Sequence, residues 1–304
     1  MGGATLYDVP APAKINLFLH VVGRRADGYH LLQTAFRFVD LCDTLHFERR
    51  GDGKLVCESP LAGLKPQDDL VLRAAQALQR ATGTRYGARI QYQKKIPAGG
   101  GLGGGSSDAA STLIALNRLW QTQLTRADLM QLALPLGADV PVFIFGQAAF
   151  AEGVGELLSP LSLPERSYVV IAPAQTVSTS AVFSSPELTR DAPYVRMLLF
   201  TDWQKAQLQA AFFGRNDLEP VVYAKYSRMR ALSLWLKHEG VNARMTGSGA
   251  CFFAEFVTLQ EASQCRQAII AKIPYCEDSK AALIDDVWAC RGLHDHPLRH
   301  WLHS

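Results

Sequence analysis

The stretch IPAGGGLGGGSSDAAS, residues 96–111, places six glycines within the seven positions 99–105. Glycine loses more conformational freedom on folding than any other residue, so this run indicates a backbone that bends sharply or approaches a ligand closely. A strand is predicted before the loop, over 88–95, and a helix after it. Because backbone N–H groups at a helix start bind anions, the loop is predicted to hold phosphate. Ser106 and Ser107 can cap the helix and can bond phosphate oxygens or a magnesium ion.

Two well-known glycine-rich motifs, the dinucleotide-binding and Walker A patterns, do not fit this segment. Gly99, Gly101 and Gly104 match G-x-G-x-x-G, but dinucleotide binding also needs a further strand ending in an acidic residue about twenty positions on. The region 120–128 is predicted instead as helix, turn and helix. The Walker A pattern fails because Ser106 stands where a lysine is required. A nicotinamide oxidoreductase and a non-catalytic nucleotide-binding protein remain as alternatives.

Two charged residues stand in apolar surroundings and could do chemistry. Asp139 lies in GADVPVF, where partial loss of water would make its carboxylate a better base. Lys14 lies early in the apolar strand AKINLFL, and an ammonium buried there needs an anion. We expect Lys14 to pair with Asp139 or with an attacking oxygen. The alternatives are an aspartate that bonds backbone N–H groups before Pro141 and a lysine that extends from a strand end into solvent.

The elements that must position these residues alternate along the chain. A boundary near 155–165 is predicted to divide two closely packed α+β halves, 1–160 and 161–304. Asn216 or Asp217 can cap the fourth predicted helix, and Pro220 fits its first turn. The predicted strands are 13–22, 31–39, 44–58, 88–95, 148–152, 168–173, 241–246 and 250–257, and the predicted helices are 69–82, 107–120, 126–134, 221–238 and 258–272.

Composition describes an ordinary globular chain of 304 residues, with 48% hydrophobic residues and a net charge of +3. Its pI is near 8.5 and it has no run of five basic residues, so charge gives no indication of nucleic acid or an anionic membrane as partner. No secretory signal or membrane span is predicted. We therefore expect a cytoplasmic protein with free, buried thiols, a monomer or weak homodimer. The histidines at 294, 296, 300 and 303 are expected in a solvated tail.

Three motifs resemble those of the GHMP small-molecule kinases. They are PAKINLFLHV at 12–21, the P-x-x-x-G-L-G pattern from Pro97 to Gly103, and ARMTGSGACFFAEF at 243–256. The resemblance implies an α+β two-domain fold: an N-terminal half like ribosomal protein S5 domain 2, a ferredoxin-like α/β C-terminal half, and an active site in the cleft between them. It also implies ATP as phosphoryl donor, with Mg²⁺ carried on the ATP.

Further segments resemble one branch of that superfamily. They are R-x-D-G-Y-H at 25–30, LGADVPVF at 136–143 and NDLE at 216–219. The resemblance implies phosphorylation of the 2-hydroxyl of a cytidine-diphosphate-linked methylerythritol, in the non-mevalonate route to isoprenoid precursors. A GHMP kinase for homoserine, mevalonate or a sugar is the alternative.

The resemblance also assigns residues to roles. Lys14 and Asp139 are the implied catalytic pair, and no residue is assigned to a metal. The implied ATP site is Lys94, Pro97, Ala98, Gly99, Gly100, Gly101, Leu102, Gly103, Gly104, Gly105, Ser106 and Ser107. The implied substrate site is Asn16, Tyr29, His30, Phe36, Thr179 and Phe183, with a substrate-phosphate loop of Thr246, Gly247, Ser248 and Gly249. Tyr29 and Phe183 are expected to sandwich a pyrimidine.

Two positions depart from the family pattern. Asp69 and Asp108 stand where the family commonly has asparagine, and both add negative charge near the expected nucleotide. We expect Asp108 to point away from the phosphates or to reach magnesium. Phe36 is equally well explained as a core residue.

Overall fold

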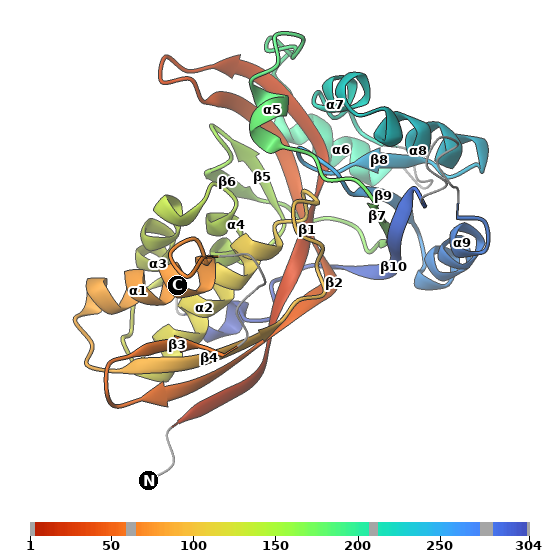
Figure 1. Ribbon diagram of the computed structural model, residues 1–304. Coiled ribbons are helices and arrows are strands. Elements are labelled where there is room, and N and C mark those ends of the chain that lie inside the picture. The colour runs from red at the N-terminus through yellow and green to blue at the C-terminus, as the bar shows by residue number, and fades with distance from the viewer. Residues whose placement is uncertain (1–3, 59–64, 207–211, 274–281, 303–304) are drawn as a thin grey trace.

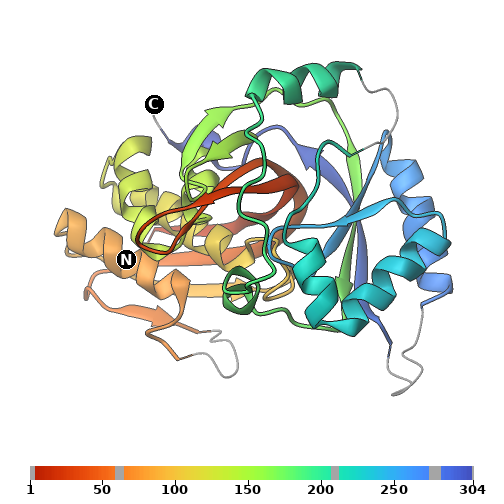
Figure 2. The same cartoon turned by 90° about the horizontal axis from the view of Figure 1, so that it is seen from above.

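Two groups of helices lie on either side of a pair of long strands in this computed structural model (Figure 1). The structure describes residues 4–58, 65–206, 212–273 and 282–302. Helices and strands mix along the chain, which confirms the α+β class. Figure 2, turned by 90°, shows the first two strands crossing the centre of the molecule between the two groups.

The long strands are β1 (Thr5–Arg24) and β2 (His30–Arg50), which pair antiparallel over most of their length. The sequence predicted the middle of β1 correctly, but it divided β2 in two. In the structure β2 is continuous because β1 pairs with it along one edge, while β4 and β5 pair with successive parts of the other. The pairing of β1 with β2 shifts register between Asn16 and Leu19, next to the predicted catalytic strand segment.

The remaining N-terminal elements cover one end of these strands. Strands β3 (Leu55–Cys57) and β4 (Gly87–Gln93) extend the sheet, and β5 (Ala149–Glu152) and β6 (Leu157–Pro160) form a hairpin beside β2. The helices of this half are α1 (Leu70–Thr82), α2 (Gly104–Trp120), α3 (Arg126–Ala133) and α4 (Val140–Phe145). Helix α1 ends at Gly83, which is left-handed with φ 61°, as predicted.

The C-terminal half is a second antiparallel arrangement with the strand order β10-β7-β9-β8. Its strands are β7 (Ser167–Pro173), β8 (Ala243–Met245), β9 (Phe252–Phe256) and β10 (Ile284–Leu293). Its helices are α5 (Thr179–Phe183), α6 (Met197–Ala206), α7 (Glu219–Lys225), α8 (Ser227–His238) and α9 (Leu259–Ala271). The end of β10 pairs with β2, which joins the two halves in one sheet path. The predicted boundary near 155–165 stays a prediction.

The single helix predicted over 221–238 is wrong. Tyr226 adopts an extended conformation, φ −126° and ψ 91°, and separates α7 from α8. Neither predicted residue is the N-cap of α7, which is Leu218. Asn216 Oδ1 accepts from the Leu218 amide just before the helix, while its Nδ2 donates to the carbonyls of Met245 and Gly247. Asp217 accepts from the Val21 amide.

Two further expectations need correction. His296 does not lie in a solvated tail: it is 1% exposed, against Phe38 and Phe143, and burial lowers its pKa to about 3. The described cysteines, at 42, 57, 251, 265 and 290, form no disulfide, but only Cys251 and Cys290 are buried. Cys276 and His303 lie outside the described residues. In the part of the chain that the structure describes, no helix has the length and apolarity to cross a bilayer.

Candidate active site

A cavity of ≈ 1020 Å³ opens between the two halves, and residues of both line it. From the N-terminal half come Lys14, the glycine loop and Asp139. From the C-terminal half come α5 and the 247–249 loop. All three motifs noted in the sequence therefore meet at one cavity, although Asn16 of the first and Thr246 of the third are 230 positions apart.

Lys14 lines the cavity and pairs with Asp139, as expected. Its side chain is 3% exposed, and its ammonium lies 3.3 Å from Asp139 Oδ2 and donates to Asn16 Oδ1 at 2.7 Å. The ammonium also lies 5.1 Å from the centre of the Phe36 ring. The carboxylate of Asp139, 39% exposed, remains open to the cavity. Asp139 stands just before α4, and its side chain caps no backbone N–H group of that helix, so the turn interpretation fails.

The glycine loop is fastened to the first and third motifs by backbone hydrogen bonds. The Lys14 amide donates to the Leu102 carbonyl, and the Cys251 amide donates to the Gly100 carbonyl. A Cβ on Gly101 would lie 2.2 Å from the Thr246 carbonyl oxygen, so no side chain fits there. The Thr246 hydroxyl in turn accepts from the Asn16 amide at 2.9 Å. The loop is therefore held in one shape by strand β1 and the 246–249 loop.

The predicted serine caps are wrong. Helix α2 begins at Gly104, three residues before the predicted start, and follows the left-handed Gly103 with no side-chain cap. Ser106 lines the cavity from the first turn, whereas Ser107 is buried and its hydroxyl has no hydrogen-bond partner among the residues that the structure describes. The amides of the first turn are left for a ligand, since no capping side chain satisfies them.

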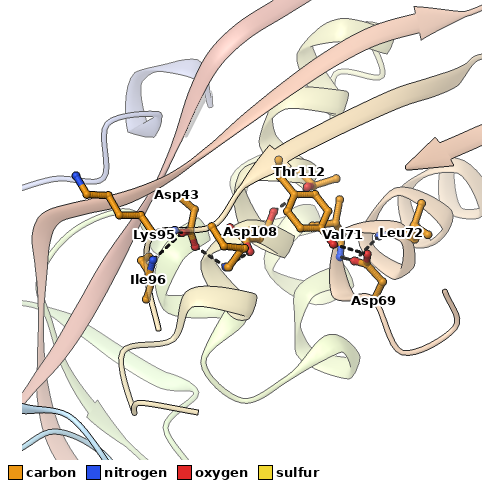
Figure 3. A network of polar contacts seen from close by, with 10 residues as sticks. Asp43, Asp69, Val71, Leu72, Lys95, Ile96, Asp108 and Thr112 are labelled. Atoms are coloured by element: carbon orange, nitrogen blue, oxygen red, sulfur yellow. Dashed lines mark hydrogen bonds and ion pairs between the residues drawn. The ribbon is translucent and has the colours of Figure 1, made fainter. Parts of the chain in front are cut away.

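Lys94 makes a buried ionic cluster with Asp43 of β2 and Asp108 of α2. Asp43 also accepts from the backbone amides of Lys95 and Ile96 at the entrance to the loop (Figure 3). Burial raises the pKa of Asp108 to about 7, against the opposing effect of Lys94. Asp108 therefore points to Lys94, and the expectation that it reaches magnesium is not needed. No pattern in the sequence indicates Asp43, which is 51 positions from Lys94.

Asp69 has a structural role at the start of α1. It caps α1 by accepting from the amides of Val71 and Leu72, and it accepts from the Tyr92 hydroxyl at 2.8 Å. Figure 3 shows it on the side of α2 away from Asp43. Aspartate is a good N-cap, so this departure from the family pattern keeps α1 and β4 together beside the cavity.

The residues expected at the pyrimidine end line the cavity as a group. Phe183 and His30 face each other with ring centres 5.2 Å apart and planes inclined by 36°. Tyr29 is 64% exposed in the turn before β2. Phe36 both lines the cavity and belongs to the core, so the two interpretations of it are compatible. Thr179 and Ser248 join the two C-terminal segments through a hydroxyl contact of 2.7 Å.

Comparison with known proteins agrees with this geometry. The family model described as GHMP kinases N terminal domain matches residues 69–147, and the one described as GHMP kinases C terminal matches residues 198–274. These place the chain in the GHMP kinase class. A solved homoserine kinase from Cytophaga hutchinsonii shares the fold at 16% identity, with a TM-score of 0.66 over 96% of this chain and 95% of its own.

Relatives with higher sequence identity to this chain indicate one family within the GHMP kinases. A 4-diphosphocytidyl-2-C-methyl-D-erythritol kinase from Bordetella parapertussis is 58% identical over 99% of this chain and all of its own length, and one from Dechloromonas aromatica is 52% identical over 95% and 98%. A crystal structure of 4-(cytidine 5'-diphospho)-2C-methyl-D-erythritol kinase superposes with a TM-score of 0.77 at 33% identity, over 95% of this chain and 99% of that one. The chain belongs to the 4-diphosphocytidyl-2-C-methyl-D-erythritol kinase family.

Proposed function

We propose that this chain transfers the γ-phosphate of ATP to the 2-hydroxyl of 4-diphosphocytidyl-2-C-methyl-D-erythritol. One observation carries the proposal: the Lys14–Asp139 pair lies in the same cavity as the glycine loop and the aromatic group of Tyr29, His30 and Phe183. The family names give the substrate, and the cavity supplies a place for each of its ends. The step belongs to the supply of isoprenoid precursors.

Asp139 accepts the proton of the attacking hydroxyl in this proposal. The hydroxyl oxygen then forms a bond to the γ-phosphorus as the bond to the β,γ-bridging oxygen breaks, and ADP leaves. Lys14 holds Asp139 and the attacking oxygen in line, and Asn16 fixes the ammonium. Phosphoryl transfer needs alignment and charge neutralisation more than covalent chemistry, and a buried ammonium beside a partly open carboxylate provides both.

The glycine loop holds the triphosphate. Its backbone is fixed before the ligand arrives, and the uncapped amides of α2 carry the positive end of the helix dipole. Lys94, whose ammonium is already bonded to Asp43 and Asp108, lies at the root of the loop, so we place it near the adenosine rather than on the phosphates.

Magnesium enters bound to ATP in this proposal. The described residues contain no group of three or more histidine, cysteine, aspartate or glutamate side chains that could hold a metal. The Ser106 hydroxyl lines the cavity and offers an oxygen atom to an ion carried on the phosphates. Such an ion would neutralise phosphate charge.

A coupled assay of ADP release tests the function. The purified chain is given Mg-ATP with the cytidylyl substrate, and homoserine and mevalonate serve as controls. We expect turnover with the cytidylyl substrate and none above background with the controls. Equal or greater turnover with a control would move the chain to another branch of the GHMP kinases.

The nicotinamide alternative fails on fold. Dinucleotide binding requires a strand after the helix that follows the glycine loop, and α2 is followed by α3. A thermal-shift experiment checks this point, because protection by Mg-ATP and not by NAD is expected of a kinase.

A further inference from the structure

Arg190 connects the two sides of the pyrimidine end of the cavity. Its Nε donates to His30 Nε2 at 3.0 Å, across 160 positions of sequence. Its two terminal nitrogens donate to the carbonyls of Leu188, Ser185 and Phe183, at 2.8, 2.7 and 3.3 Å. One guanidinium thus holds the imidazole of β2 and the end of α5, which carries the Phe183 ring.

The bond to Arg190 fixes the chemistry of His30. A guanidinium stays protonated and can only donate, so His30 Nε2 must be the acceptor. The proton of the neutral imidazole then sits on Nδ1. Burial, followed by the charges of Arg190 and Arg24, lowers the pKa of His30, which keeps the ring neutral. The nearby Asp27 carboxylate is paired with Arg25 at 2.7 Å.

We propose that Arg190 is a positioning residue of the substrate pocket, which holds His30 as an Nδ1–H donor and keeps Phe183 beside it, ready for a cytosine ring. Arg190 does not line the cavity, whereas His30 and Phe183 do. It therefore acts through them. The pyrimidine ring has acceptors at its O2 and N3 atoms, so a fixed donor in the wall is useful to it. This inference rests on the proposed function.

Steady-state kinetics give the first test, with Arg190→Gln compared with Arg196→Gln. Arg196 is an exposed arginine on the same segment whose side chain makes no hydrogen bond or ion pair among the described residues, so the control removes the same charge. We expect Arg190→Gln to raise KM for the cytidylyl substrate by about tenfold to a hundredfold, as for loss of a bond to a charged group. KM for ATP and the kcat at saturation should stay within about twofold.

Nitrogen-15 NMR of the imidazoles gives the second test and needs no substrate. His30, assigned with a His30→Gln variant, should be the neutral Nδ1–H tautomer in the wild type. In Arg190→Gln, loss of the neighbouring cation raises its pKa toward the ordinary value of about 6.5, and the proton is free to occupy Nε2.

Failure of this inference is distinct from failure of the proposed function. If His30 keeps the same tautomer and the same pKa in Arg190→Gln as in the wild type, the inference is overturned. Equal rises in KM for the cytidylyl substrate and for ATP would also overturn it, because they indicate that Arg190 only stabilises the loop. If the wild type does not turn over the cytidylyl substrate, the proposed function fails. In that case the affinity for CDP, which carries the cytosine ring, is measured by calorimetry in place of KM. Equal affinity of the wild type and Arg190→Gln for CDP would overturn the inference.

Discussion

Replacement of Asp139 by asparagine separates catalysis from stability. Asparagine keeps the shape of the side chain and can still accept a hydrogen bond from Lys14, but it cannot take the substrate proton. At 3.3 Å two unit charges attract by about 1 kcal/mol in water and about 5 kcal/mol at the effective dielectric constant of 20 for protein sites. Because the carboxylate is 39% exposed, the lower figure applies, and desolvation of Lys14 offsets part of it.

We therefore expect Asp139→Asn to change the free energy of unfolding by no more than about 1 kcal/mol. Turnover should fall by about 10²–10⁴-fold, the usual contribution of a general base. That fall corresponds to about 3–5 kcal/mol of activation free energy. KM for ATP should change little, because the glycine loop is held by backbone contacts that do not involve Asp139.

The assay is ADP release at saturating substrates, with a thermal melt of each protein. Asp285→Asn is the matched control, because Asp285 is an exposed aspartate on β10 whose side chain makes no hydrogen bond or ion pair among the described residues. A purified Asp139→Asn protein that retains kcat within about threefold of wild type would refute the assignment of Asp139 as the base. A large loss of stability with normal turnover per folded molecule would make the Lys14–Asp139 pair structural.

Three other substitutions test separate parts of the site. Phe183→Ala should raise KM for the cytidylyl substrate far more than KM for ATP, and equal rises would count against a pyrimidine at this ring. Asp108→Asn removes a carboxyl whose pKa burial raises to about 7 from 3.8, so the folded state binds its proton between those values. The unfolding free energy of the wild type should therefore fall relative to the variant as pH rises from about 4 to 7, measured by urea titration; parallel curves would contradict this. Gly105→Ala adds a methyl group whose nearest atom in the protein is Leu70 Cδ1 at 3.4 Å, an ordinary contact. Since alanine favours a helix, the melting temperature should hold or rise, while KM for ATP increases about tenfold; an unchanged KM would show that no ligand approaches this point.

The sequence predicted the pairing of Lys14 with Asp139 correctly. An ammonium in an apolar strand and a carboxylate in an apolar loop were expected to meet, and the family motif order supported that. They meet because β1 passes beside α4, which lies against α2 in the same core. Helix α4 itself was missed, because a six-residue helix with proline in its first turn has too short a pattern to detect.

Interactions between distant polar residues could not be predicted in this way. In the sequence, Asp43 stands between the two predicted strands 31–39 and 44–58, where a polar residue indicates a turn. Only the continuous pairing of β2 with β1 and β4 brings its carboxylate to the Lys94 ammonium. Arg190 lies in a loop of ordinary composition, and its partner His30 is fixed by tertiary structure alone. Asn216 was predicted as a helix cap, and its Oδ1 does accept locally from the Leu218 amide. Its Nδ2 also donates across the fold to the Gly247 carbonyl, which no local pattern indicates.

The six glycines of the loop answer two separate physical demands. Gly100 and Gly101 are required by the protein itself, since a Cβ at these positions would lie 2.5 Å from Cys251 Sγ and 2.2 Å from the Thr246 carbonyl oxygen. Their absence of side chains lets the third motif close against the loop, which fixes the loop before any ligand binds. Gly105 has no such neighbour and faces the cavity. Gly99 and Gly103 have positive φ angles of 67° and 71°, and a Cβ on Gly103 or Gly104 would lie 3.0 Å from a neighbouring side chain, so the protein's own structure also accounts for these positions. Only the approach of a ligand explains Gly105, so Gly105 reports on the nucleotide more directly than any other glycine in the motif.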